Sequence, residues 1–189
     1  MDSKQFSYMC KNDAILRQTK VSIILQSELK QIQPDFIYVV LLRIGNENKY
    51  KKKEEGKKRY ILGHWCILDT LGDRPRPQPQ PQPQPVQFMD PSGFPPPFDI
   101  YKLMIDYTFR YNTKMRCSTA VYQLMGTSIC GYLVAYALLL RSRGMPYVAI
   151  ENDKLNHNLR FLARMVPEFI KFFLPAGNRK IERFSYDFL

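Results

Sequence analysis

Four residues spread along the sequence have the chemical types that a cysteine hydrolase uses. In chain order they are His64, Asp90, Gln123 and Cys130. Such an enzyme needs a thiol nucleophile, an imidazole that takes the thiol proton, a carboxylate that orients the imidazole, and an N–H donor for the oxyanion. The set therefore indicates nucleophilic attack on a carbonyl carbon, provided that the fold brings the four side chains together.

Cys130 is expected in the first turn of a buried helix. The almost wholly apolar run 132–140 follows it, the Thr-Ser pair at 127–128 can cap the helix start, and Gly144 and Pro146 are stop signals. A thiol at a helix start lies near the positive end of the helix and near free amide hydrogens. Both lower its pKa and favour the reactive thiolate.

His64 and Asp90 are expected to meet across a β-hairpin. Residues 60–70 and 86–90 have the composition of strands, and a Pro-Gln repeat at 75–85 separates them. The repeat lacks every second amide donor, so it predicts an extended and exposed insertion. In an antiparallel hairpin the start of the first strand lies beside the end of the second, where the carboxylate can accept from the imidazole.

Gln123 lies seven residues before Cys130, at the end of a short strand expected at 119–124. Its side-chain amide and the backbone N–H of Cys130 would form an oxyanion hole. Taken singly, each residue also has a structural explanation: a buried thiol, a hydrogen-bonded strand histidine and a turn-opening aspartate are all common. Their combination in this order favours a site.

The remaining pattern predicts a single α+β domain over residues 1–189. Besides the elements above, the sequence predicts helices and strands by their apolar periodicity. The expected helices cover 12–32, 98–110 and 159–173, and the expected strands cover 36–44 and 147–150.

The composition adds a strong positive charge. The chain has 189 residues, a formal net charge of +11 and a pI of about 9.5, which favours an anionic partner such as nucleic acid or a membrane surface. Much of the charge lies in residues 49–59, which form either a solvated hairpin tip or a nucleic-acid contact. The residues assigned to that contact are Lys51, Lys52, Lys53, Lys57 and Lys58.

Other classes of protein lack support in the sequence. The four cysteines show no Cys-x-x-Cys spacing and the two histidines show no zinc-site spacing with them, so no metal site is predicted. Few cysteines and a polar N-terminus without an apolar segment favour free thiols in a reducing, intracellular compartment. The longest apolar run, 129–140, is too short to cross a bilayer, so no transmembrane segment is expected.

Three motifs resemble the adenovirus protease (adenain) family of cysteine endopeptidases. The family has relatives in Polinton/Maverick elements and other large DNA viruses and, more distantly, among proteases of SUMO and other ubiquitin-like modifiers. The resemblance covers roughly residues 36–143, and its most specific part is Gln-x6-Cys-Gly before an apolar helix. The motifs are Gly63-His64-Trp65, Asp90-Pro91-Ser92-Gly93, and Gln123 with Cys130-Gly131.

The resemblance implies a rearranged papain-like fold, in which the central helix that carries the cysteine packs on a small mixed sheet. It implies that His64 is the general base, Asp90 orients it, Cys130 is the nucleophile and Gln123 supports the oxyanion. It also implies cleavage of viral or transposon-encoded precursor and capsid proteins after small residues, such as Gly-Gly or Gly-Ala, in the host nucleus or virion. No residue pattern requires a cofactor, but DNA or a peptide is the kind of activator that the family uses.

Two alternatives stay open at this point. The first is a protease that removes ubiquitin-like modifiers, which needs a broad surface for a folded substrate. The second is a basic nucleic-acid-binding virion protein in which the site has lost its activity. Turnover of a modifier conjugate tests the first alternative, and labelling of Cys130 by a thiol-reactive substrate analogue tests the second.

Overall fold

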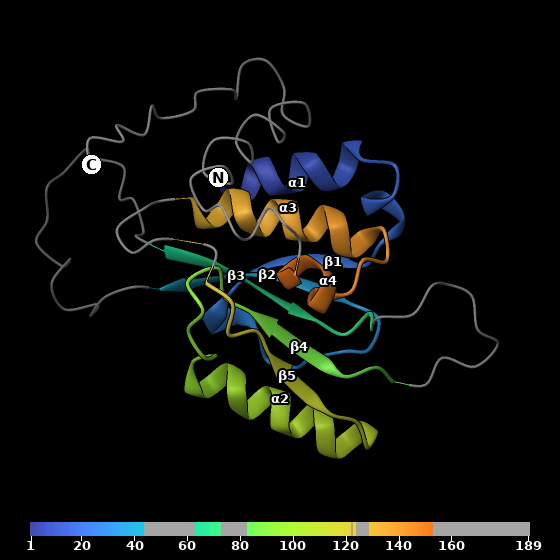
Figure 1. Ribbon diagram of the computed structural model, residues 1–189, viewed down its shortest axis with the longest axis vertical. Helices are drawn as coiled ribbons and strands as arrows, with labels where there is room; N and C mark the ends of the chain where they lie inside the picture. The colour runs from blue at the N-terminus through green and yellow to red at the C-terminus, as the bar shows by residue number, and fades with distance from the viewer. Residues whose placement is uncertain (44–62, 73–82, 122, 124–128, 153–189) are drawn as a thin grey trace, which may run out of the picture.

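A five-stranded mixed sheet lies at the centre of the protein, in the strand order β1-β2-β3-β4-β5 (Figure 1). The computed structural model describes residues 1–43, 63–72, 83–121, 123 and 129–152. The strands are β1 (Val21–Leu25), β2 (Ile37–Arg43), β3 (Gly63–Asp69), β4 (Val86–Met89) and β5 (Met115–Cys117). The helices are α1 (Ser3–Asn12), α2 (Phe98–Tyr111), α3 (Cys130–Ser142) and α4 (Tyr147–Asn152), with 3₁₀ turns at 16–18 and 26–28.

The hairpin that the sequence predicts around the Pro-Gln repeat is present. β3 pairs with β4 in antiparallel fashion, with Ile67 opposite Met89, and β2 pairs with the other edge of β3. Parallel pairs complete the sheet: β1 beside β2, and β5 beside β4. Continued by one residue, the β3–β4 register sets Cys66 opposite Asp90, with His64 as the diagonal neighbour of that carboxylate.

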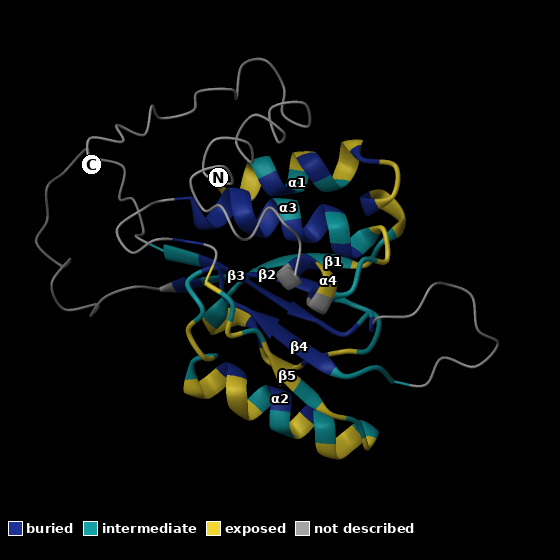
Figure 2. Cartoon of the chain, in the orientation of Figure 1, coloured by how far each residue is buried: buried dark blue, intermediate teal, exposed yellow. Residues whose placement is uncertain are grey.

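Two apolar layers enclose the sheet, and they follow the alternation of side chains along the strands (Figures 1 and 2). On the face covered by α1 and α3, Trp65 and Ile67 pack with Val134 and Leu138. On the face covered by α2, Cys66 and other strand residues pack with the buried side of that helix, formed by Ile100, Met104 and Tyr107. Successive residues of β3 therefore serve different layers.

Helix α3 lies between the sheet and α1, which explains why nearly all its residues are buried. It begins at Cys130, as predicted, but Ile129 is its N-cap residue and makes no side-chain capping bond. The Thr-Ser pair proposed as the cap lies outside the described residues. Gly144 follows the helix with φ +83° and Met145 N–H bonds Leu140 O, so the predicted glycine stop is confirmed.

Three predicted elements are wrong. Residues 12–32 are not one helix: α1 lies earlier, where Asp2 and Gln5 form a capping box, and the β-branched residues of β1 join the sheet beside β2. The strand expected at 119–124 lies earlier, as β5. Residues 147–150 belong to α4, where the N–H groups of Ala149 and Ile150 both donate to the carbonyl of Pro146.

The Pro-Gln repeat is not exposed along its full length. Its last residues, 83–85, are half-buried, and the Gln84 carbonyl accepts from the Tyr107 hydroxyl at 3.2 Å. The earlier part of the repeat, the basic segment 49–59 and the helix expected at 159–173 lie outside the described residues. Among the helices that the structure describes, none is both long and apolar enough to cross a membrane.

Candidate active site

The structure brings His64, Asp90 and Cys130 together from three separate elements. His64 lies near the start of β3, Asp90 directly follows β4, and Cys130 is the first residue of α3. His64 Nε2 lies 2.7 Å from Asp90 Oδ1, and His64 is also hydrogen-bonded to the thiol of Cys130. Because Asp90 engages Nε2, the second ring nitrogen is the one left for Cys130. The imidazole therefore links the thiol to the carboxylate.

The surroundings of Cys130 favour its thiolate. Burial alone would raise the pKa of Cys130, but the hydrogen bond from His64 and the backbone N–H groups of Trp65 and Gly131 outweigh burial and lower it. The Gly131 N–H belongs to the first turn of α3, where amides have no intrahelical partner, whereas His64 and the Trp65 N–H come from β3. The pKa of Cys130 is thus lowered first by His64, and the free amide at the helix start, that of Gly131, adds to this effect.

The surroundings of His64 favour its protonated form. Burial alone would lower the pKa of His64, but its bonds to Asp90 and Cys130, together with their negative charges, raise it to about 9. At neutral pH the ring therefore carries two N–H groups, one directed to each partner. A thiolate beside an imidazolium is the resting form that thiol nucleophiles need.

Several donors fix the carboxylate of Asp90, which is 2% exposed. Oδ1 accepts from His64 and, at 2.6 Å, from the backbone N–H of Ser92. Oδ2 accepts from the thiol of Cys66 at 3.5 Å. The turn itself closes through a bond from the Gly93 N–H to the Asp90 carbonyl at 2.9 Å, and Gly93 has φ +73°. The Asp-Pro-Ser-Gly motif is therefore a tight turn that holds the carboxylate towards His64.

Gln123 lies beside this turn rather than at a strand end. Its side chain is buried, and its backbone N–H donates to the Pro91 carbonyl at 2.8 Å. The next candidate residue along the chain is Cys130, at the start of α3. Gln123 is thus attached to the loop of Asp90 and precedes the nucleophile, which is compatible with the oxyanion role expected for it.

The two residues that follow His64 and Cys130 lie against each other. A Cβ atom built on Gly131 would lie 3.2 Å from Trp65 Cδ1 and 2.9 Å from Met1 Cβ, so no larger side chain fits at Gly131 without a shift. Trp65 Nε1 donates to the Met1 carbonyl at 3.0 Å, and its ring contacts that of Phe6 at 4.9 Å. The N-terminal segment and α1 therefore fix the tryptophan beside the candidate nucleophile.

The same cluster holds three groups that can ligate a metal, although the sequence predicted no metal site. Ligand atoms of His64, Cys66 and Asp90 lie within 4.8 Å of one another. Imidazole, thiolate and carboxylate are zinc ligands. Each of these groups is already engaged by another member of the cluster, and the resulting bonds match the needs of a thiol hydrolase, so we assign the cluster to that chemistry.

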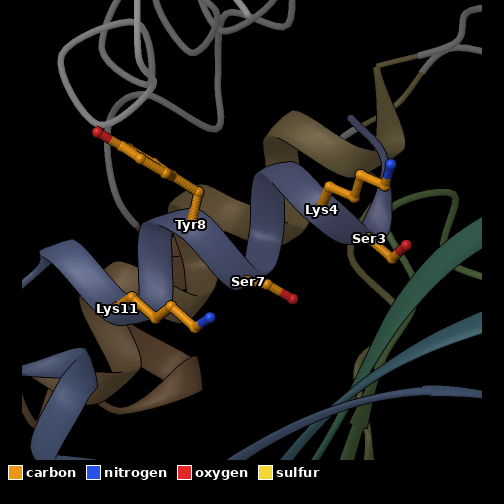
Figure 3. A pocket seen from close by; sticks show the side chains of 5 residues that line it. All are labelled: Ser3, Lys4, Ser7, Tyr8 and Lys11. Carbon is orange, nitrogen blue, oxygen red and sulfur yellow. The ribbon is translucent and has the colours of Figure 1, made fainter.

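A hollow of about 330 Å³ lies elsewhere, along the outer side of α1 (Figure 3). Its described lining comes from α1 alone: Ser3, Lys4, Ser7, Tyr8 and Lys11. None of the four candidate residues contributes to it, so the candidate site is defined by side-chain geometry and not by this hollow.

Comparison with known proteins identifies the fold. The structure resembles two crystal structures of the ASFV pS273R protease, one of them of the selenomethionine protein. Both give a TM-score of 0.50, at 11% and 10% sequence identity, over 85% of this chain. This chain spans 62% of the length of that protease. No protein-family model and no curated protein matches the sequence.

The fold is therefore the α+β, papain-like fold that the sequence predicts, with the cysteine helix packed on a small mixed sheet. At this level of identity the likeness establishes the architecture, and the roles of individual residues rest on the geometry above. The site has a further neighbour, Cys66, which the sequence motifs do not include. The signal was present, because residues two apart in a strand share a face and Asp90 lies across the hairpin.

Proposed function

We propose that the protein is a cysteine endopeptidase with Cys130 as nucleophile and His64 as general acid and base. The observation that supports this most strongly is the continuous hydrogen-bonded series from Cys130 through His64 to Asp90, with partners from three different elements. A structural role for one of these residues would explain one bond. It would not explain a thiol of lowered pKa beside a histidine of raised pKa.

The chemistry follows from these positions. The Cys130 thiolate attacks the carbonyl carbon of the scissile peptide bond, and the negative oxygen is stabilised by the backbone N–H of Cys130 and the amide of Gln123. The His64 imidazolium gives its proton to the leaving amine, which departs and leaves a thioester. Neutral His64 then takes a proton from water, whose attack releases the acid and restores the ion pair. Asp90 keeps the ring oriented and stabilises its charged form throughout.

The close packing around the nucleophile supports a preference for small residues at the cleavage point. Gly131, the residue after Cys130, lies so close to Trp65 and Met1 that no larger side chain fits there without a shift. The sequence resemblance supports viral or transposon-encoded precursor proteins as substrates, in the host nucleus or virion. The fold shared with the ASFV pS273R protease supports a protein substrate in general.

Cleavage of candidate substrates tests the proposal. The wild-type protein and Cys130→Ala are incubated with the other proteins of the same genome, and new termini are mapped by mass spectrometry. We expect cuts after small residues with the wild type and none with the variant. A parallel incubation with conjugates of ubiquitin-like modifiers separates an endopeptidase from a modifier protease. Identical fragment patterns for wild type and variant would refute the proposal.

A further inference from the structure

The thiol of Cys66 is a buried polar group that the proposed mechanism does not use. It is fully buried, on the α2 side of β3, among the apolar residues of that layer. It donates a hydrogen bond to Asp90 Oδ2, at 3.5 Å. A side chain in this position cannot reach a substrate, so any functional role must act through Asp90.

The carboxylate of Asp90 needs donors on both oxygens. Oδ1 receives two, from His64 and from the backbone of Ser92, while Oδ2 receives the thiol of Cys66. A buried carboxylate oxygen without a donor is costly, and a carboxylate held at one oxygen only can rotate about its Cβ–Cγ bond. Rotation would move Oδ1 away from the ring of His64.

The thiol is suited to act as a permanent donor. Burial raises the pKa of Cys66 well above its usual value, and the negative charge of Asp90 adds to the effect, so the sulfur keeps its proton at any working pH. Asp90 is the acceptor opposite Cys66 in the continued hairpin register. The direction of this bond is therefore fixed, unlike that of a hydroxyl, which can also accept.

We propose that Cys66 is a positioning residue: it donates its S–H to Oδ2 of Asp90 and so holds Oδ1 on the imidazole of His64. The inference rests on the proposed function, because it assigns a role within the same site. It adds to the site a third residue of the β3–β4 hairpin, after His64 and Asp90, and one that touches neither substrate nor reacting atoms.

Three substitutions at Cys66 separate hydrogen bonding from packing. Cys66→Ser keeps a donor, Cys66→Ala removes donor and volume, and Cys66→Val removes the donor but fills the space. We expect Ala and Val to lower kcat roughly tenfold, as for the loss of one hydrogen bond to a charged group, with KM unchanged. We expect Ser to stay within about threefold of wild type. Cys117→Ala, at an exposed free cysteine on β5, is the control.

The pH dependence of kcat/KM is a readout that a loss of packing alone would not change. The titratable groups that act on His64 are Asp90, after β4, and Cys130, on α3. Cys66, on the same strand as His64, interacts with Asp90. A carboxylate turned away stabilises the imidazolium less, so the alkaline limb of kcat/KM should move to lower pH in Ala and Val and stay in place in Ser. All assays contain EDTA to remove any metal bound to the cluster.

A measurement that needs no turnover tests the role of Cys66 independently of protease activity. The chain has two histidines, so a His157→Gln background leaves His64 as the single imidazole signal in histidine-labelled NMR spectra. Cys66→Ala and Cys66→Val should lower the pKa of His64, whether or not the wild type cleaves peptides. Three outcomes would each overturn the role of Cys66. The pKa of His64 could keep its wild-type value in both variants, or kcat could fall while the alkaline limb of kcat/KM stays in place. The third outcome is that Cys66→Ser is as impaired as Cys66→Ala.

Discussion

The two ends of α3 make different electrostatic contacts with the same strand. Where α3 and β3 begin, Cys130 on the helix meets His64 on the strand. His64 Nε2 is paired with Asp90 Oδ1 at 2.7 Å. At their ends, Arg141 on α3 meets Asp69 on β3 at 2.6 Å. Both ends thus contain a cation beside a carboxylate, but the side chains of His64 and Asp90 are 12% and 3% exposed, whereas those of Arg141 and Asp69 are fully buried.

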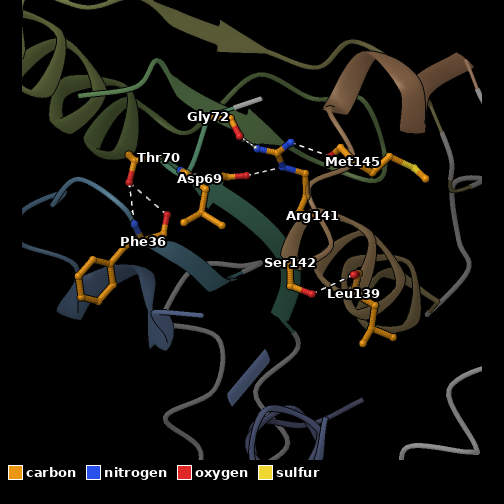
Figure 4. Close-up of polar contacts among 9 residues, drawn as sticks. Phe36, Asp69, Thr70, Gly72, Leu139, Arg141, Ser142 and Met145 are labelled. Carbon is orange, nitrogen blue, oxygen red and sulfur yellow. Dashed lines mark hydrogen bonds and ion pairs between the residues drawn. The ribbon is translucent and has the colours of Figure 1, made fainter. Parts of the chain in front are cut away.

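The Arg141 end has the features of a permanent structural contact (Figure 4). The guanidinium donates to the carbonyls of Gly72 and Met145 as well as to Asp69, and its centre lies 4.5 Å from the ring of Tyr147. Burial raises the pKa of the Asp69 carboxyl even beside the guanidinium, whereas the arginine stays protonated at any pH that a protein meets, so the cluster always holds a cation. It ties the end of α3 to the end of β3 and to the start of α4.

The difference shows how one helix–strand pair can hold a reactive group. A thiolate beside an imidazolium must change its protonation state during each turnover, so its partners must titrate and must be reachable. The fixed ion pair at the far end secures the packing of α3 on β3 without taking part. We therefore expect substitutions at the Cys130 end to change activity and substitutions at the Arg141 end to change stability.

The largest expected effect is the loss of the nucleophile. Cys130→Ala removes one sulfur at a helix start, so proteolysis should fall by at least about 10⁴-fold while the protein stays folded. His64→Ala should lower activity by a comparable factor, because the two groups act as a unit. Steady-state kinetics and urea unfolding measure both. Near wild-type cleavage by Cys130→Ala would show that Cys130 is not the nucleophile.

The reverse pattern is expected at the other end. Arg141→Met leaves the Asp69 carboxylate buried without its cation, which should lower the free energy of unfolding by about 3–5 kcal/mol. The double variant Arg141→Met with Asp69→Leu should lose less, because no unpaired charge remains. At a temperature where the variants are folded, kcat should stay near that of the wild type. A single variant as stable as wild type would show that this contact does not secure the helix.

The two ends should also differ in their response to alkaline pH. The pKa of His64 is raised to about 9 in the folded protein, above the ordinary value of 6.5. Its contribution to stability is therefore complete below pH 6.5 and is lost as the pH rises through about 9, and activity should fall over the same alkaline range as the imidazolium deprotonates. The lowered pKa of Cys130 acts in the opposite direction: its contribution is complete above the ordinary value of 9.0 and is lost as the pH falls through the folded value.

Profiles of kcat/KM and of the free energy of unfolding against pH measure this effect. The Arg141 end should add no alkaline dependence of activity, so Arg141→Met should show the wild-type alkaline limb for kcat/KM. The stability of the double variant Arg141→Met with Asp69→Leu, which leaves no unpaired carboxylate, should run parallel to that of wild type. His64→Gln is the matched control for the other end, and its stability should be flatter between pH 6.5 and 9. An alkaline limb for activity that lies well below the pKa of about 9 would mean that another group controls turnover.

The sequence predicts the reactive end of this comparison better than the structural end. The cysteine helix, the hairpin and the meeting of His64 with Asp90 depend on local signals: an apolar run with stop residues, and two strands around a low-complexity repeat. The pair Arg141–Asp69 joins residues 72 positions apart, and nothing in either segment indicates the other. Charged residues are usually exposed, so their burial could not be expected.

The errors have similar causes. Residues 21–25 contain adjacent isoleucines that fit part of a helical face. They form β1 because they can pair in parallel with the edge of β2, and this tertiary contact outweighs the local pattern. The contact of Cys66 with Asp90 depends on the strand register, which the hairpin prediction left open by a residue or two. Gln123 was placed at a strand end, and the structure instead attaches it to the turn after Asp90 through Pro91.

The smallest expected effect concerns the Pro-Gln repeat, which leaves β3 at the Arg141 end and returns to β4. Gly72 just before it accepts from Arg141, and a Cβ built on Gly72 would lie 2.4 Å from the Gln84 side chain. Residues 83–85 are thus part of the packed domain, so a deletion should keep them. Replacing residues 75–82 with a short Gly-Asn turn should leave kcat unchanged and alter the free energy of unfolding by less than about 1 kcal/mol, because loop-closure entropy varies slowly with length.

Extending the deletion through residue 85 provides the contrast. It removes the Gln84 carbonyl that accepts from Tyr107 and disturbs the approach to Gly72, so it should destabilise the Arg141 end while the kcat of the folded protein stays near wild type. Urea unfolding and peptide cleavage, measured on both deletions, separate the two effects. If the short deletion alone abolished cleavage, the repeat would have a role at the Cys130 end, and the division of labour between the two ends of α3 would not hold.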